Sequence, residues 1–145
     1  MTKELVKLFD TLKEKGLKLT SARRIILECL SSSPNQLYTA LDLFVQVRDK
    51  NKRVNFSTVY RNLEVLTDCG LVQKIVFEGS AKYQLRAEDS HHHHLICTVC
   101  NKTETLPYCP LGDLTETILE ESCFMPTEHI VEIYGYCREC RPEKD

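Results

Sequence analysis

Apolar residues recur at helical spacing through the first 70 residues and predict four helices there. The first should end near Gly16 and the fourth at Gly70, because glycine readily adopts the left-handed conformation that ends helices. Serines and a proline at residues 31–34 should end the second. The hydroxyl residues placed to cap the last three helices are Thr20, Thr39 and Ser57. The buried faces should comprise Leu5, Leu8, Phe9, Leu12, Ile25, Ile26, Leu27, Leu30, Ala40, Leu43, Phe44, Val47, Val59, Leu63 and Leu66.

The periodicity changes after the fourth helix. Residues 71–77 (LVQKIVF) alternate like a strand, residues 78–80 form a turn, and residues 81–85 return. Helices followed by such a hairpin predict a winged helix-turn-helix, whose fourth helix would enter a DNA major groove. The alternative is an ordinary solvated surface. Side chains of this helix suited to DNA contact are Ser57, Thr58, Tyr60, Arg61 and Asn62. Basic residues suited to phosphate contact are Lys18, Arg23 and Arg24.

A polar hinge at residues 88–90 precedes a different pattern, which predicts a small α+β domain. Strands are expected at residues 91–96, 102–106 and 129–136. A helix before the last strand should carry Leu111, Leu114, Ile118 and Leu119. The predicted fold class is mixed α/β, with a winged-helix domain over residues 1–86 and an α+β domain over residues 87–145.

Charge divides the chain at the same point. The net charge is −2, yet residues 1–86 hold 15 Lys and Arg against 9 Asp and Glu, a charge of +6. Residues 87–145 hold 4 against 12, a charge of −8. A basic nucleic-acid-binding module joined to an acidic module explains this asymmetry better than chance solvation of two faces.

Bulk properties limit the location and the class of protein. No apolar run approaches the roughly 18 residues of a membrane span, and the start MTKELVKLFD does not resemble a signal peptide, so a cytoplasmic location is expected. Eight cysteines in a reducing compartment indicate metal binding rather than disulfides. The sequence has no HExxH, no pairing of His-x-Glu with PCxxC and no nucleophile motif, so no enzyme activity and no small-molecule substrate are expected.

Two CxxC motifs, Cys97-Thr-Val-Cys100 and Cys137-Arg-Glu-Cys140, are the most specific signal in the chain. Each places two thiolates on one tight turn, and four sulfurs form the tetrahedral set that zinc prefers in closed structural sites. Because 36 residues separate the motifs, such a metal would clip together the two ends of the second domain. Iron in a four-thiolate site and a redox disulfide pair are alternatives. The cysteines expected as small core residues are Cys29 and Cys123.

The five histidines form a run at residues 91–94 and a separate His129. On a strand, alternate histidines of the run face opposite sides, so each pair can chelate one exchangeable ion. A solvated polar segment is the alternative. The residues expected in a regulatory site are His92, His94, Asp68, Glu88 and Asp89, with Cys69 as a weaker candidate. Those expected in a second site are His91, His93 and His129, with Cys109 or Asp113 as a fourth ligand.

Four stretches of the chain together resemble the ferric uptake regulator (Fur) family of metal-sensing repressors: GLKLTSARRIILECL, FSTVYRNLEVLTDCGLV, SHHHHLICTVCNK and HIVEIYGYCREC. The resemblance implies a C-terminal dimerisation domain and a homodimer that binds an inverted-repeat DNA operator when loaded with metal. The positions that match its structural zinc ligands are Cys97, Cys100, Cys137 and Cys140. Those that match its regulatory and dimerisation-domain metal sites are His92 and His94, and His91, His93 and His129, respectively. Those that match its DNA-contacting residues are Lys18, Tyr60 and Arg61.

Two departures bear on which ion is sensed. Iron and peroxide sensors of the family carry a histidine where this chain has Leu37, and a carboxylate near the position of Gln84. The stretch KTETLPYCPLGDL is instead similar to zinc uptake regulators, in which an acid at the position of Asp68 joins two histidines and a cysteine. That cysteine is missing from KYQLRAED, which leaves the fourth ligand open.

The sequence therefore predicts a metal-dependent repressor of metal-uptake genes, with one structural zinc and a second, regulatory divalent ion. Zinc is the expected regulatory ion, and iron or manganese are alternatives. An iron- or peroxide-responsive regulator of the same family is the alternative function. A zinc-ribbon interaction module without DNA binding is the alternative from another class.

Overall fold

The computed structural model describes residues 1–86 and 93–143. It divides the chain into two compact units, Met1–Arg86 (unit 1) and Ala87–Asp145 (unit 2). Within the described residues, no helix is both long enough and apolar enough to cross a membrane.

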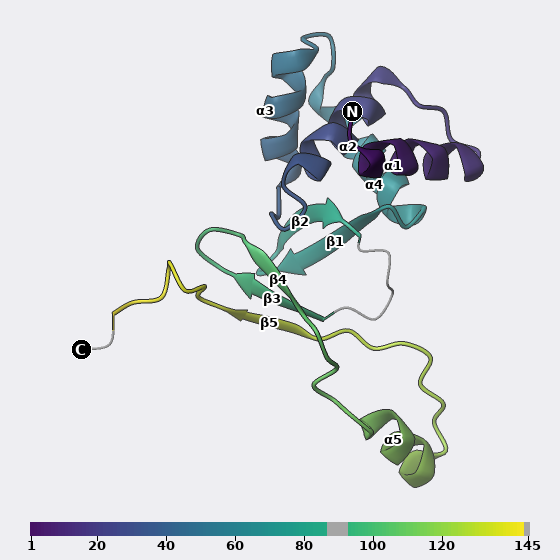
Figure 1. The fold of residues 1–145 in the computed structure, drawn as a ribbon, viewed down its shortest axis with the longest axis vertical. Helices are drawn as coiled ribbons and strands as arrows, with labels where there is room; N and C mark the ends of the chain where they lie inside the picture. The colour runs from purple at the N-terminus through teal and green to yellow at the C-terminus, as the bar shows by residue number, and fades with distance from the viewer. Residues whose placement is uncertain (87–92, 144–145) are drawn as a thin grey trace. The chain divides into compact units, whose positions relative to one another are not determined.

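Unit 1 consists of four helices followed by a two-stranded antiparallel hairpin (Figure 1). The helices are α1 Lys3–Glu14, α2 Ser21–Ser32, α3 Ala40–Lys50 and α4 Phe56–Asp68. The strands are β1 Val72–Phe77 and β2 Ser80–Leu85. Glu78 and Gly79, with φ of 51° and 76°, make the turn between them. This arrangement confirms the predicted winged helix-turn-helix.

Side-chain caps fix where the helices begin. The hydroxyl of Thr20 accepts the backbone N–H of Arg23, which confirms the predicted cap of α2. Thr39 caps α3 and forms a capping box with Asp42, because each side chain accepts the other's backbone N–H. The predicted cap of α4 is wrong: Ser57 is the second residue of the helix, and Asn55, which precedes the first residue Phe56, supplies the cap.

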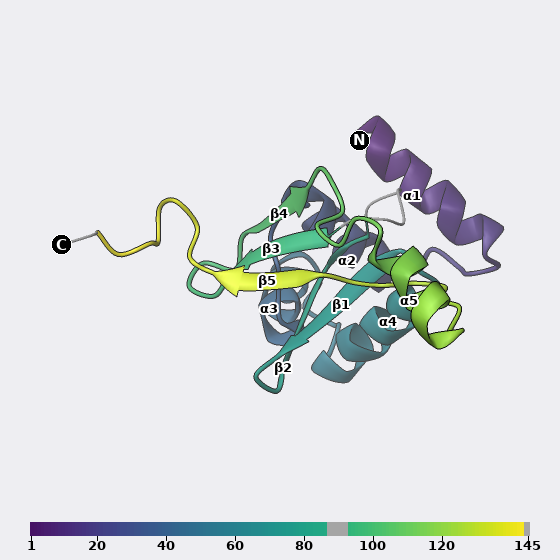
Figure 2. The same cartoon turned by 90° about the horizontal axis from the view of Figure 1, so that it is seen from below.

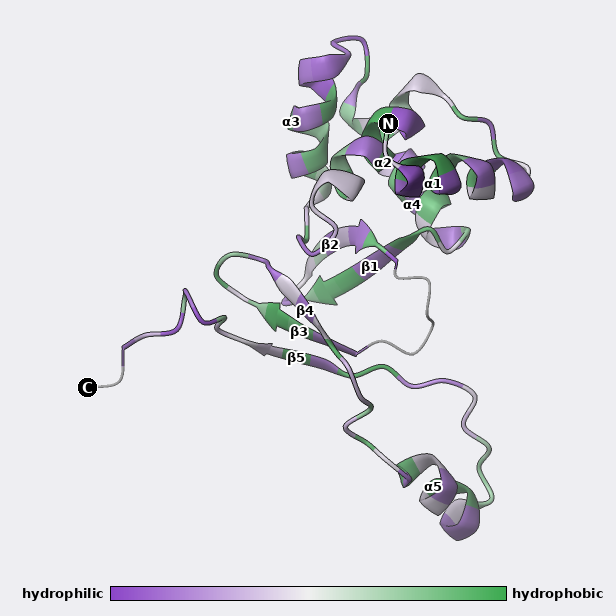
Figure 3. Cartoon of the chain, in the orientation of Figure 1, coloured by the Kyte–Doolittle hydropathy of each residue, from purple (hydrophilic) through white to green (hydrophobic). Residues whose placement is uncertain are grey.

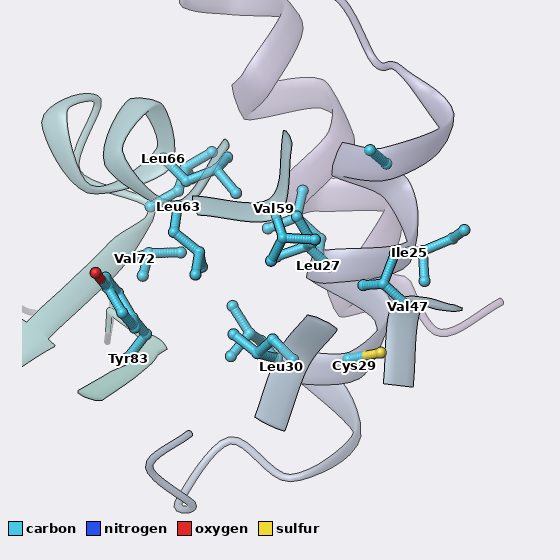
Figure 4. Close-up of a cluster of buried hydrophobic side chains, with 14 of the residues drawn as sticks. Ile25, Leu27, Cys29, Leu30, Val47, Val59, Leu63, Leu66, Val72 and Tyr83 are labelled. Atoms are coloured by element: carbon cyan, nitrogen blue, oxygen red, sulfur yellow. The ribbon is translucent and has the colours of Figure 1, made fainter. Parts of the chain in front are cut away.

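One apolar core joins the helices of unit 1 to its hairpin (Figure 4). Leu27, Val59 and Leu63 have no exposed surface, and Figure 4 shows side chains of α2, α4, β1 and β2 pointing into the same space. Figure 3 shows hydrophobic and hydrophilic residues alternating along α1 and α3, as expected for helices with one buried face. Cys29 is 4% exposed, so its predicted place in the core is confirmed.

Unit 2 contains a three-stranded sheet in the order β4-β3-β5 (Figure 2). Its elements are β3 His93–Cys97, β4 Thr103–Leu106, α5 Leu114–Ser122 and β5 Glu132–Gly135. The central strand β3 pairs with β4 antiparallel and with β5 in parallel. The parallel pairing requires a long crossover, which α5 and its flanking loops provide.

None of the residues of the crossover helix α5 is buried. Leu111, predicted to lie on this helix, precedes it. Cys123, predicted to lie in the core, is exposed and ends α5 in the left-handed conformation with a φ of 56°. The apolar pattern predicted the helix and its residues Leu114, Ile118 and Leu119 correctly, but such a pattern does not by itself say what covers its apolar face.

Candidate metal centres and nucleic-acid interface

The four CxxC cysteines converge at one end of the sheet in unit 2. Cys97 is the last residue of β3 and pairs with Gly135, the last residue of β5. The second CxxC turn therefore begins just beyond the same end of the sheet. The four sulfur atoms lie within 4.8 Å of one another, and those of Cys100 and Cys137 are 3.8 Å apart. The parallel pairing of β3 with β5 therefore brings together two motifs that are far apart in the sequence.

Backbone hydrogen bonds hold both CxxC turns. The N–H of Asn101 donates to the carbonyl of Cys97 at 3.0 Å, and the N–H of Arg141 donates to the carbonyl of Cys137 at 2.9 Å. An exposed ion pair between Lys102 and Glu139, with an N···O distance of 3.1 Å, links the two turns. The turns are thus formed by the chain's own hydrogen bonds, and the sulfurs remain available as ligands.

The electrostatics of this cluster favour a bound cation. Burial raises the pKa of the Cys97 thiol, but the backbone N–H groups of Cys100, Cys137 and Val99 outweigh burial and lower it to about 6. Hydrogen bonding with the Cys137 thiol, together with burial, raises the pKa of Cys140 to about 12. The Cys97 thiolate is stabilised here, whereas the raised pKa values of Cys100 and Cys140 oppose their ionisation beside it, so a dication would favour ionisation of the whole set. This donor set fits the predicted structural zinc.

A second cluster joins His93, Cys109 and His129, which come from β3 and from the two loops that flank α5. The Cys109 sulfur lies 3.3 Å from Nε2 of His93 and 3.2 Å from Nε2 of His129. The two imidazole rings stack with their centroids 5.1 Å apart. Two nitrogens and a sulfur can occupy three corners of a tetrahedral metal site. His91, the other residue predicted for this site, lies outside the described residues.

The chain just before β5 holds the ring of His93 on the side away from Cys109. The backbone N–H of Val131 donates to Nδ1 of His93 at 3.1 Å, and the N–H of His94 donates to the Val131 carbonyl at 3.0 Å. His93 is 1% exposed, so its ring cannot turn freely. These contacts direct Nε2 of His93 toward Cys109.

Of the five residues predicted for the regulatory site, the structure describes two, Asp68 and His94. His92, Glu88 and Asp89 lie outside the described residues. Asp68 is exposed at the end of α4 in unit 1, and His94 is buried in β3 of unit 2. Among the described residues, neither belongs to a group of three converging ligands.

The two positions at which the resemblance implies metal ligands in iron and peroxide sensors hold buried residues in this chain. Leu37 is 2% exposed and has no atom that could bind a metal. Gln84 is 3% exposed, and its side-chain nitrogen donates to the side-chain oxygen of Gln73 on the neighbouring strand. Each position therefore stabilises the fold of unit 1 through packing or hydrogen bonding.

The exposed face of α4 carries the residues predicted for DNA contact. The hydroxyls of Ser57 and Thr58 both donate to Oδ1 of Asn55, at 2.9 and 2.8 Å. Nε of Arg61 donates to the Ser57 carbonyl, and Tyr60 is 44% exposed. The first turn of α4 is therefore well ordered and presents an aromatic ring and a guanidinium to solvent.

Two other residues predicted for DNA contact, Arg23 and Asn62, bind each other. Nε of Arg23 donates to Oδ1 of Asn62 at 2.8 Å, and both side chains are half-buried. Sequence reasoning missed this pair because the two residues are 39 positions apart. It also missed Asn55, although asparagine is as good an N-cap as serine. Val131 could not have been found, because it acts through its backbone.

A winged helix-turn-helix and a four-cysteine metal cluster in one chain define a metal-binding, DNA-binding regulator. The model of the ferric uptake regulator family matches residues 14–134. The chain therefore belongs to the ferric uptake regulator family of metal-responsive transcriptional regulators, as its sequence motifs predicted.

The proteins to which this chain is similar include regulators named for peroxide, iron and zinc. The peroxide operon regulator of Bacillus subtilis is 33% identical over 142 residues, which cover 98% of this chain and 97% of that protein. The structure of the Vibrio cholerae ferric uptake regulator aligns with a TM-score of 0.70 at 30% identity, covering 88% of this chain and 98% of that one. A zinc uptake regulator complexed with zinc and DNA shares the fold, with a TM-score of 0.75 at 22% identity, covering 96% and 95% of the two chains.

Proposed function

We propose that this chain is a zinc-responsive repressor that binds an inverted-repeat DNA operator as a homodimer. The observation that carries the choice of zinc is the cluster of His93, Cys109 and His129. A thiolate with two imidazoles suits zinc, whereas manganese and magnesium prefer carboxylate and carbonyl oxygens. The absence of metal-binding atoms at Leu37 and of a carboxylate at Gln84 further weakens an iron-type site.

Each metal site has a separate proposed role. The four cysteines would hold a permanent zinc that closes unit 2, so that its binding energy contributes to folding. The regulatory site would use ligands from both sides of the hinge: His92, His94, Asp68, Glu88 and Asp89. The cluster of His93, Cys109 and His129 would hold a further zinc and so fix the strand β3, which also carries His94. A divalent ion supplies the positive charge around which such ligands can gather. A fixed spacing of the two units would favour simultaneous binding to the two half-sites of the operator. Bound metal would therefore raise the affinity of the protein for DNA, and bound DNA would raise its affinity for metal.

The homodimer is supported by apolar surface on unit 2. Several large apolar side chains are exposed on the α5 crossover and on β5: Leu111, Leu114, Leu119, Phe124, Met125, Ile130 and Ile133. So many exposed apolar residues on one small unit are typical of an interface. A second copy of the chain is the partner that a two-fold symmetric operator requires.

Metal titration of operator binding tests this function. The operator would be selected from a random-sequence duplex pool with zinc-loaded protein, and its affinity measured at buffered free zinc, ferrous iron, manganese and nickel. Zinc should act at the lowest free concentration, in line with the thiolate and the two imidazoles of the cluster of His93, Cys109 and His129. Selective activation by ferrous iron would show that the protein is an iron regulator instead.

A peroxide-responsive regulator is the second candidate, because the Bacillus subtilis relative at 33% identity bears that name. The test is to expose ferrous-loaded and zinc-loaded protein to hydrogen peroxide and then measure operator binding. A zinc-responsive repressor should show no loss that depends on ferrous iron. Loss confined to the ferrous-loaded protein, with oxidised histidine detected by mass spectrometry, would favour the second candidate.

A further inference from the structure

Arg23 in α2 connects two segments that carry proposed DNA contacts. Its Nε donates to Oδ1 of Asn62 in α4, and its Nη1 donates to the backbone carbonyl of Lys18, both at 2.8 Å. Asn62 in turn donates its Nδ2 to the carbonyl of Thr58, also at 2.8 Å. Both polar atoms of the Asn62 amide and two nitrogens of the guanidinium are therefore engaged inside the protein.

These bonds leave Asn62 poorly suited to reading DNA. An asparagine that recognises adenine uses its oxygen and its nitrogen together. Here that would break two short hydrogen bonds and leave Nε of a half-buried guanidinium without its acceptor, which is costly. The Lys18 carbonyl also accepts the N–H of Thr20 at 3.1 Å, so the loop that carries the Lys18 side chain is fixed on the same support.

We propose that Arg23 and Asn62 are positioning residues that set the reading face of α4 against the Lys18 loop, and that neither reads DNA bases or relies on a phosphate. The inference rests on the proposed DNA binding and concerns unit 1 alone. The competing interpretation is that Arg23 neutralises a phosphate with the remainder of its guanidinium. The two interpretations differ for lysine, because an ammonium keeps the charge but cannot reproduce the fork that reaches two acceptors.

The experiment compares Arg23→Lys, Arg23→Gln, Asn62→Ala and the double variant Arg23→Lys/Asn62→Ala, all as zinc-loaded full chains with folding checked by circular dichroism. Positioning predicts that both Arg23 variants and Asn62→Ala weaken binding to the selected operator by about tenfold, a typical effect of losing a buried hydrogen bond to a charged group. The double variant should bind no more weakly than the single variants. Lys13→Gln, which removes one exposed charge from α1, is the control and should retain operator affinity.

Salt dependence on a random-sequence duplex separates positioning from phosphate contact. Positioning predicts that Arg23→Gln leaves the slope of log affinity against log salt unchanged. A phosphate contact predicts that Arg23→Lys retains operator affinity while Arg23→Gln lowers the slope by about 0.9. This second pattern would overturn the inference.

A measurement without DNA distinguishes failure of this inference from failure of the proposed function. In ¹⁵N-labelled protein, the Arg23 Nε–H should exchange with water at least about tenfold more slowly than that of the exposed Arg48, and Asn62→Ala should remove this protection. Rapid exchange in the unmodified chain would refute the pair even if the protein represses. A protected Nε–H in a protein that binds neither duplex would refute the proposed function, and the positioning role with it.

Discussion

The backbone N–H of Val131 donates to Nδ1 of His93, and the other ring nitrogen, Nε2, faces the Cys109 sulfur. A neutral imidazole that accepts at Nδ1 carries its hydrogen on Nε2, where a metal would bind. A metal-ligating histidine instead donates its second N–H to an acceptor. Binding of zinc at Nε2 should therefore turn Nδ1 of His93 from an acceptor into a donor and break its hydrogen bond with the Val131 N–H. Zinc titration of protein with a filled four-cysteine site should shift the Val131 amide resonance, although Val131 is no ligand.

Cys109→Ser provides the matched control for that titration. It replaces the sulfur by a poorer zinc ligand of similar size and should weaken zinc binding at this site by about tenfold or more. The Val131 resonance should then move only at correspondingly higher zinc. If zinc fills the site at full stoichiometry and the Val131 signal stays in place, the proposed exchange does not occur.

The cap of α4 allows a direct comparison of two neighbouring residues. Oδ1 of Asn55 accepts the backbone N–H of Thr58 and the hydroxyls of Ser57 and Thr58. Asn55→Ala should therefore lower the free energy of unfolding by about 1 kcal/mol. Ser57→Ala, at an exposed helical position, should change it by less than about 0.5 kcal/mol. Urea denaturation of the zinc-loaded protein, followed by circular dichroism, measures both. Equal losses would favour the cap predicted from sequence.

Local sequence patterns were sufficient for the elements of unit 1. Helical periodicity, hydroxyl caps and a two-residue repeat are local signals, so the helices and the hairpin could be predicted to within a few residues. The cap of α4 was misplaced because three consecutive polar or aromatic residues, 55–57, offered two suitable cap residues. The Arg23–Asn62 bond depends on how α2 packs against α4, and no local pattern records that packing.

In the metal clusters, too, the ligands with a local sequence signal could be predicted, and those that depend on the path of the chain could not. The CxxC spacing predicted four converging sulfurs because each pair is local and zinc chemistry requires four ligands. For the second site, the alternation of the histidine run indicated His93, and Cys109 or Asp113 was expected as the fourth ligand. The choice of Cys109 came from the path of the crossover, which returns His129 to the same place. Exposure of Cys123 was missed because burial depends on partners outside the helix.

Removal of the structural zinc should unfold unit 2 selectively. The small sheet has few buried residues, and zinc binding at four thiolates contributes about 10–16 kcal/mol to folding of small zinc domains. Cys137→Ser should therefore lose the structural zinc and the dispersed NMR signals of residues 93–143, whereas the core signals of unit 1 should persist. The matched control is Cys123→Ser, at an exposed cysteine outside the cluster, which should keep both. A folded unit 2 in zinc-free Cys137→Ser would contradict the structural role.

Ionisation of Tyr83 should make unit 1 less stable at high pH. Burial, followed by the negative charge of Glu64, raises the pKa of Tyr83 to about 12. An unfolded tyrosine ionises near pH 10, so between about pH 10 and 12 the folded state binds more protons than the unfolded state. Stability therefore falls as pH rises through this window, and below it the contribution is fully present.

Tyr83→Phe should remove this component, so the variant should lose less stability than the unmodified chain between pH 10 and 12. Glu64→Gln should bring the Tyr83 ionisation, followed by tyrosinate absorbance, to a lower pH while burial keeps it above 10. Equal pH dependence in Tyr83→Phe and the unmodified chain would show that Tyr83 ionises as easily folded as unfolded.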